Sequence, residues 1–167
     1  MKTSMSVFLV FALCFTQCAC TQSQIINDLE IAADAASAAA PIVLGAAGLP
    51  AGVVNYVADA NKAITCASTA IEAGGSSAAV AAAVVGCLAT AVAPALPAGT
   101  PETVVAVVSA LDADIQSILK QYTASAQAAL KAVGGEYHMS TMDKYHVHKI
   151  KSITHKTAVA LAKGGVF

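Results

Sequence analysis

Apolar residues recur at intervals of three and four positions along most of the chain, which is the spacing of one face of an α-helix. The first such run lies between Ile25 and Ala36, with Ser23 as a candidate N-terminal cap. Because proline removes a backbone donor and clashes with the preceding turn, this helix is expected to end near Pro41. The Gly- and Pro-rich residues 41–52 predict a short helical turn followed by a loop.

The middle of the chain predicts a hairpin of two helices around the turn sequence Gly-Gly-Ser-Ser at 74–77. A seam of apolar residues with steps of four and three runs from Val53 to Ile71. A second helix is expected from about Ser77 to Ala93. The sequence PALPAGTP, residues 94–101, then excludes a continuous helix.

Two more helices complete the predicted architecture. One begins at Thr100, followed by a proline and an acidic residue, and its apolar seam continues to Val133. The other has a capping box from Ser140 to Asp143 and is expected from about 141 to 163. Its apolar stripe consists of Val147, Ile150, Thr154, Ala158 and Leu161.

The composition agrees with helices throughout. The chain is 57% hydrophobic but only 5% aromatic, it has no Trp, and alanine supplies much of the apolar count. Alanine has the highest helix propensity, yet each alanine buries little surface. We therefore predict an all-α protein: an Ala-rich helical bundle with a helical hairpin, one long helix and a C-terminal amphipathic helix.

The N-terminal residues 1–20 resemble a secretory signal peptide. A single lysine precedes an apolar stretch from Met5 to Phe15, which is shorter than a membrane-spanning helix. Export to the periplasm, the cell surface or the medium is the expectation. Two processing routes fit: cleavage after Cys20, or lipidation of Cys18 or Cys20 as the first residue of a lipoprotein.

Charge divides the remaining chain into two predicted regions. Residues 21–135, the Ala-rich bundle, carry three Lys and eight acidic residues. Residues 136–167, the His- and Lys-rich C-terminal helix, carry five Lys and two acids. No Arg occurs anywhere, so the bidentate guanidinium contacts that commonly recognise phosphate are absent, and nucleic acid is not an expected partner.

Cys66 and Cys87 lie at nearly equal distances from the turn of the predicted hairpin. If the two helices are antiparallel, the two cysteines sit at matching heights. In an oxidising compartment a disulfide is then the natural interpretation. A redox pair or a metal site is less well supported, because no histidine is adjacent.

Two long uncharged intervals raise the question of a membrane. No charged residue occurs between Asp34 and Asp59, or between Glu72 and Glu102. Either interval is long enough to span a bilayer, but prolines interrupt both and alanine favours insertion only weakly. A bundle outside the bilayer is therefore favoured, and the alternative is a membrane-active protein of the lysis or pore type with an Ala-rich transmembrane hairpin.

No catalytic or nucleotide-binding motif occurs in the sequence. Asp112 and Asp114 resemble a carboxylate pair, but residues two apart on a helix point in directions about 200° apart. We expect neither an enzyme nor a cofactor.

All four histidines lie between His138 and His155, and His146-Val147-His148 looks like a metal chelate. In a strand these two rings would share one face, whereas in a helix they diverge. The capping box and the apolar stripe favour a helix, so no metal is expected and His146 and His148 remain weak candidate ligands.

The predicted C-terminal helix carries a basic flank of Lys144, His148, Lys151 and His155, and a solvent-facing row of Lys149, Lys156 and Lys163. In one interpretation its apolar stripe packs on the bundle, whose acidic residues face these lysines. In the other, the helix binds an anionic membrane surface, a polyanion or another envelope protein. The overall expectation is an exported, non-catalytic protein with an interaction or structural role.

Overall fold

Five α-helices make up most of the part of the chain that the structure describes. The structure, a computed structural model, describes the backbone of residues 4–129, 136–137, 139 and 141–164, and the side chains of residues 23–76, 79–123, 139 and 141–164. The elements are α1 (Ser4–Gly45), α2 (Ala51–Ala73), β1 (Gly75–Ser76), α3 (Ser77–Leu88), α4 (Glu102–Ala129), β2 (Glu136–Tyr137) and α5 (Thr141–Lys163). The predicted all-α class is confirmed.

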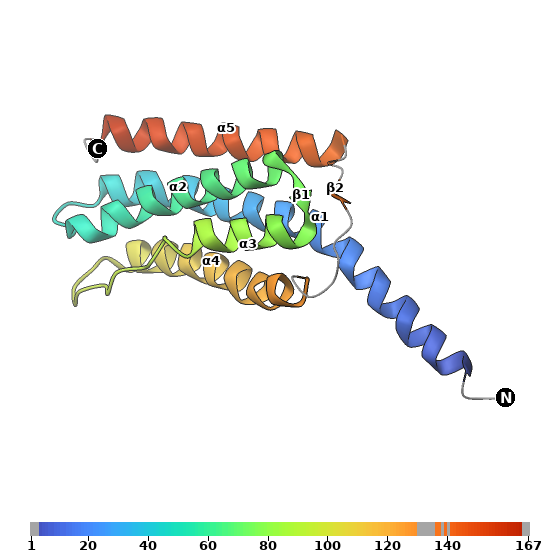
Figure 1. Ribbon diagram of the computed structural model, residues 1–167. Coiled ribbons are helices and arrows are strands. Elements are labelled where there is room, and N and C mark those ends of the chain that lie inside the picture. The colour runs from blue at the N-terminus through green and yellow to red at the C-terminus, as the bar shows by residue number, and fades with distance from the viewer. Residues whose placement is uncertain (1–3, 130–135, 138, 140, 165–167) are drawn as a thin grey trace.

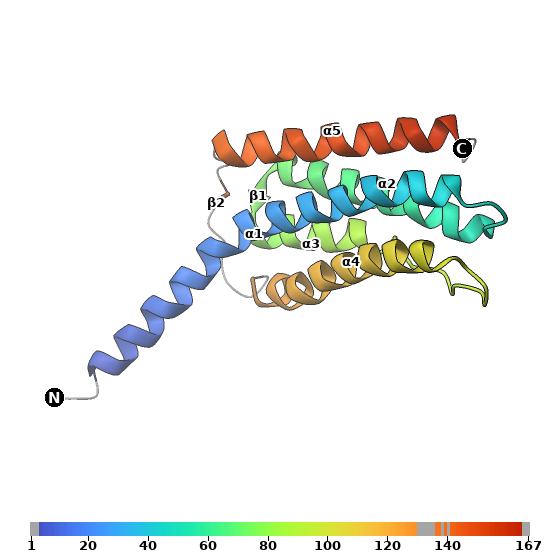
Figure 2. The same ribbon diagram turned by 180° about the vertical axis from the view of Figure 1, so that it is seen from behind.

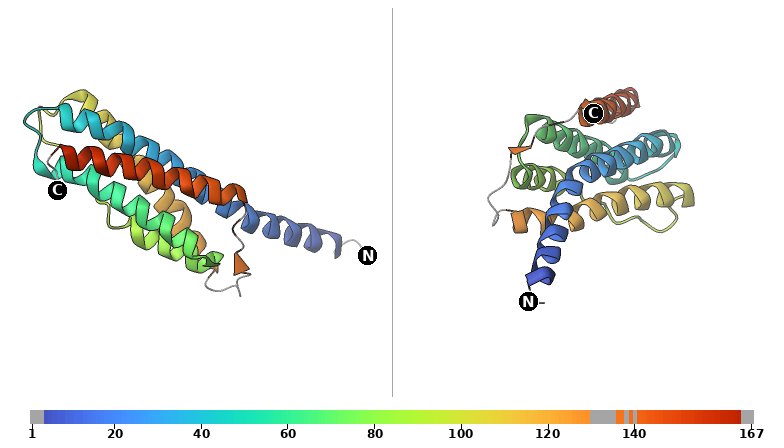
Figure 3. Two further views of the ribbon diagram at one scale, coloured as in Figure 1. Left: turned by 90° about the horizontal axis from the view of Figure 1, so that it is seen from above. Right: turned by 90° about the vertical axis from the view of Figure 1, so that its right-hand side faces the viewer.

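The helices are stacked in three layers (Figures 1 and 2). Helices α1 and α2 lie side by side in the middle layer, with α3 and α4 on one side of them and α5 on the other. Helices α1, α4, α3 and α2 contact one another in a closed ring, and α5 lies along the groove between α1 and α2. The N-terminal part of α1 extends beyond the bundle (Figure 3).

The core combines small and large side chains. Helix α1 contributes a buried alanine face, and α4 contributes large residues that fill the space opposite it. The alanines are Ala32, Ala33, Ala36, Ala39 and Ala40, and the large residues are Leu111, Ile115, Ile118 and Tyr122. Each Leu or Ile buried in this way stabilises the fold by about 1.5–3 kcal/mol.

Helix α1 corrects two predictions. It continues through Pro41 and ends at Gly45. Pro41 is exposed and lies about one turn from the end of the helix, so the backbone hydrogen bond that proline cannot donate affects only this last turn. Ser23 does not cap the helix, since the helical backbone already begins at Ser4.

Two other helix ends differ from the sequence pattern or lie outside the described residues. Helix α3 ends at Leu88 rather than near Ala93: Thr90 and Ala91 donate to carbonyls three residues earlier, which tightens the chain into a turn before Pro94. Helix α4 is described to Ala129, so the predicted end near residue 133 is not covered.

A cysteine pair joins α2 to α3, and a short strand pairing joins the turn between them to the segment before α5. Cys66 of α2 and Cys87 of α3 lie at disulfide-bonding distance with their Cα atoms 5.7 Å apart, as predicted from their spacing about the turn. The turn between these helices forms β1, which pairs antiparallel with β2 just before α5, Gly75 opposite Tyr137 and Ser76 opposite Glu136. This pairing places the start of α5 beside the α2–α3 turn.

Candidate functional site

Helix α5 presents two different faces, and its inner face packs against α1 and α2. The described helix, Thr141–Lys163, matches the predicted range, with Asp143 in its first turn, where a negative charge is favourable. Ser140, the predicted cap, lies outside the described residues. The buried residues of α5 follow the predicted stripe, with Thr157 in addition and Ala158 only half-buried; they are Val147, Ile150, Thr154, Thr157 and Leu161.

Glu30 of α1 is the centre of an ion cluster on one edge of this interface. It is 8% exposed, and its two carboxylate oxygens have different partners on α5. Nδ1 of His146 lies 2.6 Å from one oxygen, and Nζ of Lys149 donates to the other. Although burial opposes ionisation, the hydrogen bond from Lys149, assisted by that from His146, lowers the pKa of Glu30.

The same contact acts on Lys149. The hydrogen bond to Glu30 raises the pKa of Lys149, so each partner favours the charged form of the other. Lys149 was predicted in the solvent-facing row, but it reaches back to α1, which the flexible four-carbon stem of lysine allows.

The other edge of α5 is joined to α2. Nζ of Lys151 donates to the carboxylate of Glu72 near the end of α2. Lys151 was predicted as part of an anion-binding flank, and in the structure an acid of the bundle occupies it. Acids from α1 and α2 thus bind lysines on opposite sides of the apolar stripe.

Between these edges, the α2–α5 contact is partly polar. Asn61 of α2 is 4% exposed, and its Nδ2 donates to the backbone carbonyl of Thr154 at 3.1 Å. The Oδ1 atom of Asn61 has no hydrogen-bond partner among the described residues. The buried hydroxyls of Thr154 and Thr157 donate to carbonyls of α5 itself. An unsatisfied buried oxygen costs roughly 1–3 kcal/mol, so this interface is not fully optimised.

The outer face of α5 is cationic with exposed apolar side chains between the charges. Tyr145 is 64% exposed and Val159 is 39% exposed. The exposed basic residues on this face are Lys144, His148, His155, Lys156 and Lys163. Asp143 is the one acid in the helix, and it lies about 160° from Val159 at 100° per residue.

The predicted divergence of His146 and His148 is confirmed by the helical backbone. His146 contacts Glu30 at the interface, whereas His148 is exposed on the outer face. Among the described residues, no three His, Cys, Asp or Glu side chains come close enough together to hold a metal ion. His138 and the side chains of Cys18 and Cys20 lie outside the described part of the chain.

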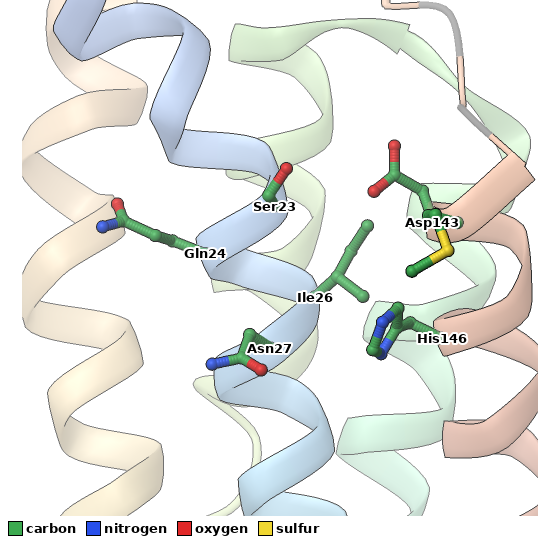
Figure 4. A pocket seen from close by; sticks show the side chains of 7 residues that line it. Ser23, Gln24, Ile26, Asn27, Asp143 and His146 are labelled. Atoms are coloured by element: carbon green, nitrogen blue, oxygen red, sulfur yellow. The ribbon is translucent and has the colours of Figure 1, made fainter.

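An open pocket of about 310 Å³ lies between the described start of α5 and α1, next to the ion cluster. In Figure 4, Ile26 of α1 and His146 of α5 point toward each other across this pocket, while Gln24 points away. Ser23, Asn27, Met142 and Asp143 complete its lining. The pocket is a shallow extension of the α1–α5 seam with mixed polar and apolar walls.

The carboxylates of Asp112 and Asp114 on α4 point in different directions, as predicted, but both are half-buried and each lies near a group on another helix. Asp112 lies 3.5 Å from the hydroxyl of Tyr56 on α2. Burial and the charge of Asp28 on α1 raise the pKa of Asp114. Asp28 itself accepts a hydrogen bond from the buried Tyr122 at 3.1 Å. Asp112 and Asp114 therefore face different helices, and neither forms a paired acid site with the other.

Sequence reasoning missed the acidic partners, Glu30 and Glu72. Both were visible only as part of the acidic excess of the bundle, because no local pattern indicates which acid meets which lysine. In the part of the chain that the structure describes, no helix combines the length and apolarity needed to cross a membrane. Family models, curated proteins and solved structures gave no match to this chain.

Proposed function

We propose that this protein is an exported, non-catalytic helical protein that attaches to anionic membrane surfaces through the outer face of α5. One observation carries the proposal: α5 uses two of its lysines to hold the bundle and leaves a cationic face exposed. Lys144, Lys156 and Lys163 stand on that face, together with two exposed histidines. Each lysine near an anionic bilayer contributes roughly 1 kcal/mol of attraction.

The apolar groups on the same face favour a lipid surface over a soluble polyanion. Tyr145 and Val159 are exposed between the lysines. Tyrosine is enriched at membrane interfaces, where its ring lies among apolar groups and its hydroxyl remains in water. A soluble polyanion would use the charges but gain little from these two side chains.

Two features support the exported location. The N-terminal stretch resembles a signal peptide, which is the feature of the sequence that predicts export. The pairing of Cys66 and Cys87 is of the kind that persists in oxidising compartments. The acidic bundle then stands away from the membrane while α5 faces it.

The test compares binding of the protein to vesicles of phosphatidylcholine with and without an equal part of phosphatidylglycerol. The ratio of the two affinities removes any contribution of the apolar N-terminal stretch. The double variant Lys144→Gln/Lys156→Gln is expected to lower this ratio about 30-fold, from two lysines at roughly 1 kcal/mol each. Lys62→Gln/Lys120→Gln, an equal charge change on α2 and α4, is the matched control and is expected to change the ratio about twofold or less.

Three results would overturn the proposal. Equal affinity for both vesicle types would exclude electrostatic attachment. Equal losses in the two double variants would show that only net charge matters. Tight binding to soluble polyphosphate without binding to anionic vesicles would assign the cationic face to a polyanion.

A further inference from the structure

We infer that the buried face of α5 is a second lipid-binding surface, and that an anionic bilayer competes with the bundle for this helix. The inference rests on the proposed function and deepens it. In the docked state only the outer face touches lipid, whereas in the released state α5 turns its apolar stripe into the bilayer interface.

The inner face of α5 is thinly apolar for a helix of 23 residues. Val147, Ile150 and Leu161 are its fully buried large apolar side chains, and Thr154 and Thr157 occupy the positions between them. Helix α4, by contrast, buries a longer apolar row, made up of Val104, Val108, Leu111, Ile115, Ile118 and Tyr122. Helix α5 therefore contributes fewer large buried apolar side chains of its own to the fold than α4 does, and less of the hydrophobic stabilisation comes from them.

The polar contact with α2 points in the same direction. The Oδ1 atom of Asn61 has no partner among the described residues while α5 is docked. Because a buried acceptor without a donor disfavours the state that contains it, hydration of Asn61 after release recovers free energy. The docked state thus carries a penalty that the released state lacks.

The ion pairs that hold α5 are also of a kind that lipid can replace. Lys149 and Lys151 flank the apolar stripe on its two sides and bind Glu30 and Glu72. Anionic headgroups offer the same interaction to both lysines, whose stems can lie along the bilayer surface with the stripe below them. Release therefore exchanges carboxylate partners for phosphate partners.

The rest of the bundle does not depend on α5 for closure. Helices α1, α4, α3 and α2 contact one another in a ring, and Cys66 and Cys87 lie at bonding distance between two of these helices, α2 and α3. Departure of α5 uncovers the groove between α1 and α2, both of which are rich in small alanine side chains. A ring of four helices remains after release.

The first test weakens docking without touching α5. Glu30→Gln/Glu72→Gln removes both acids that hold the helix, and we expect about fivefold tighter binding to equal mixtures of phosphatidylcholine and phosphatidylglycerol. Apparent affinity rises because a larger fraction of the protein is competent to bind through the inner face. Asp59→Asn/Glu102→Gln makes the same change in net charge at two exposed acids and is expected to alter binding by about twofold or less. Equal gains in both variants would overturn the inference.

The second test measures directly whether the inner face of α5 contacts lipid. The chain has no Trp, so Ile150→Trp and Val159→Trp give single reporters on the inner and outer faces. With brominated phosphatidylglycerol in the vesicles, quenching of the reporter at 150 at least as strong as that at 159 is the expected result. Quenching at 159 alone would overturn the inference. If Ile150→Trp lowers the helical circular dichroism, the half-buried Ile153→Trp replaces it.

Loss of membrane attachment and loss of α5 release would give different results in these tests. If anionic vesicles do not bind the wild-type protein, the proposed function is wrong, and the release of α5 is wrong with it. If they bind it through the outer lysines, but only the reporter at 159 is quenched, attachment stands and release is excluded.

Discussion

The carboxylate of Glu30 lies 2.6 Å from Nδ1 of His146, although 116 positions separate the two residues in sequence. The same carboxylate also accepts a hydrogen bond from Lys149, one helical turn further along α5. A nearly buried acid on α1 thus binds two basic side chains of the C-terminal helix, and this contact joins the two helices.

Replacing Glu30 with Gln should loosen α5 and lower the free energy of unfolding by about 1.5–3 kcal/mol, the range for hydrogen bonds to charged groups. Gln keeps the size of the side chain but removes the charge that Lys149 and His146 bind. Urea denaturation followed by circular dichroism measures the change. Asp59→Asn, at an exposed acid on α2, is the control and should cost less than about 1 kcal/mol. Equal costs in the two variants would contradict the role given to Glu30.

The stability contributed by Glu30 should depend on pH in a defined direction. Its pKa is lowered below the ordinary value of 4.5, first by the hydrogen bond from Lys149 and then by His146, against the effect of burial. A carboxyl with a lowered folded-state pKa stabilises fully above its unfolded value and loses this contribution as the pH falls through the folded value. The contribution of the Glu30 charge to the difference in stability between wild type and Glu30→Gln should therefore shrink as the pH falls below about 4.5. A difference that grows on acidification would contradict this sign.

Asp114 on α4 presents the opposite case. Burial, together with the charge of Asp28, raises its pKa, so its ionised form is disfavoured in the folded state. Asp114→Asn should raise the melting temperature at pH 7 by about 1–3 °C, and the gain should shrink as acid protonates Asp114 in the wild type. Asp112→Asn, two residues away and beside Tyr56, is the matched control, for which we expect no gain. A differential scanning calorimetry series over pH distinguishes the two.

Helical periodicity predicted most of this fold because it is a local property. The apolar steps of α2 and α5 identify the residues that the structure buries, and the capping pattern located the start of α5. Pro41 shows where a local rule fails: proline was expected to end α1, yet near a helix end and on the exposed side its cost is small enough for packing to continue the helix.

The contacts between helices could not be derived in the same way. Glu30 and Glu72 are two of eight acids in residues 21–135, and nothing beside them in sequence distinguishes them from Asp34 or Asp59. Which acid meets which lysine depends on the rotation of α5 about its axis in the α1–α2 groove. That rotation is set by the packing of its apolar stripe and by the bond from Asn61 to Thr154.

The pairing of Cys66 and Cys87 leads to the last prediction. The bond would close a loop with a sequence separation of 21 residues, and loop closure of this size stabilises by roughly 3 kcal/mol in the chain-entropy model. Cys66→Ser/Cys87→Ser should lose about this amount, and non-reducing mass spectrometry of the wild type should show the two cysteine peptides joined. Adding a reducing agent should destabilise the wild type but leave the double variant unchanged. Because the link lies between α2 and α3, its loss should lower the stability of the ring of four helices and leave the ion cluster around Glu30 intact at temperatures where the bundle remains folded. Free thiols in protein recovered from an oxidising compartment would contradict the pairing.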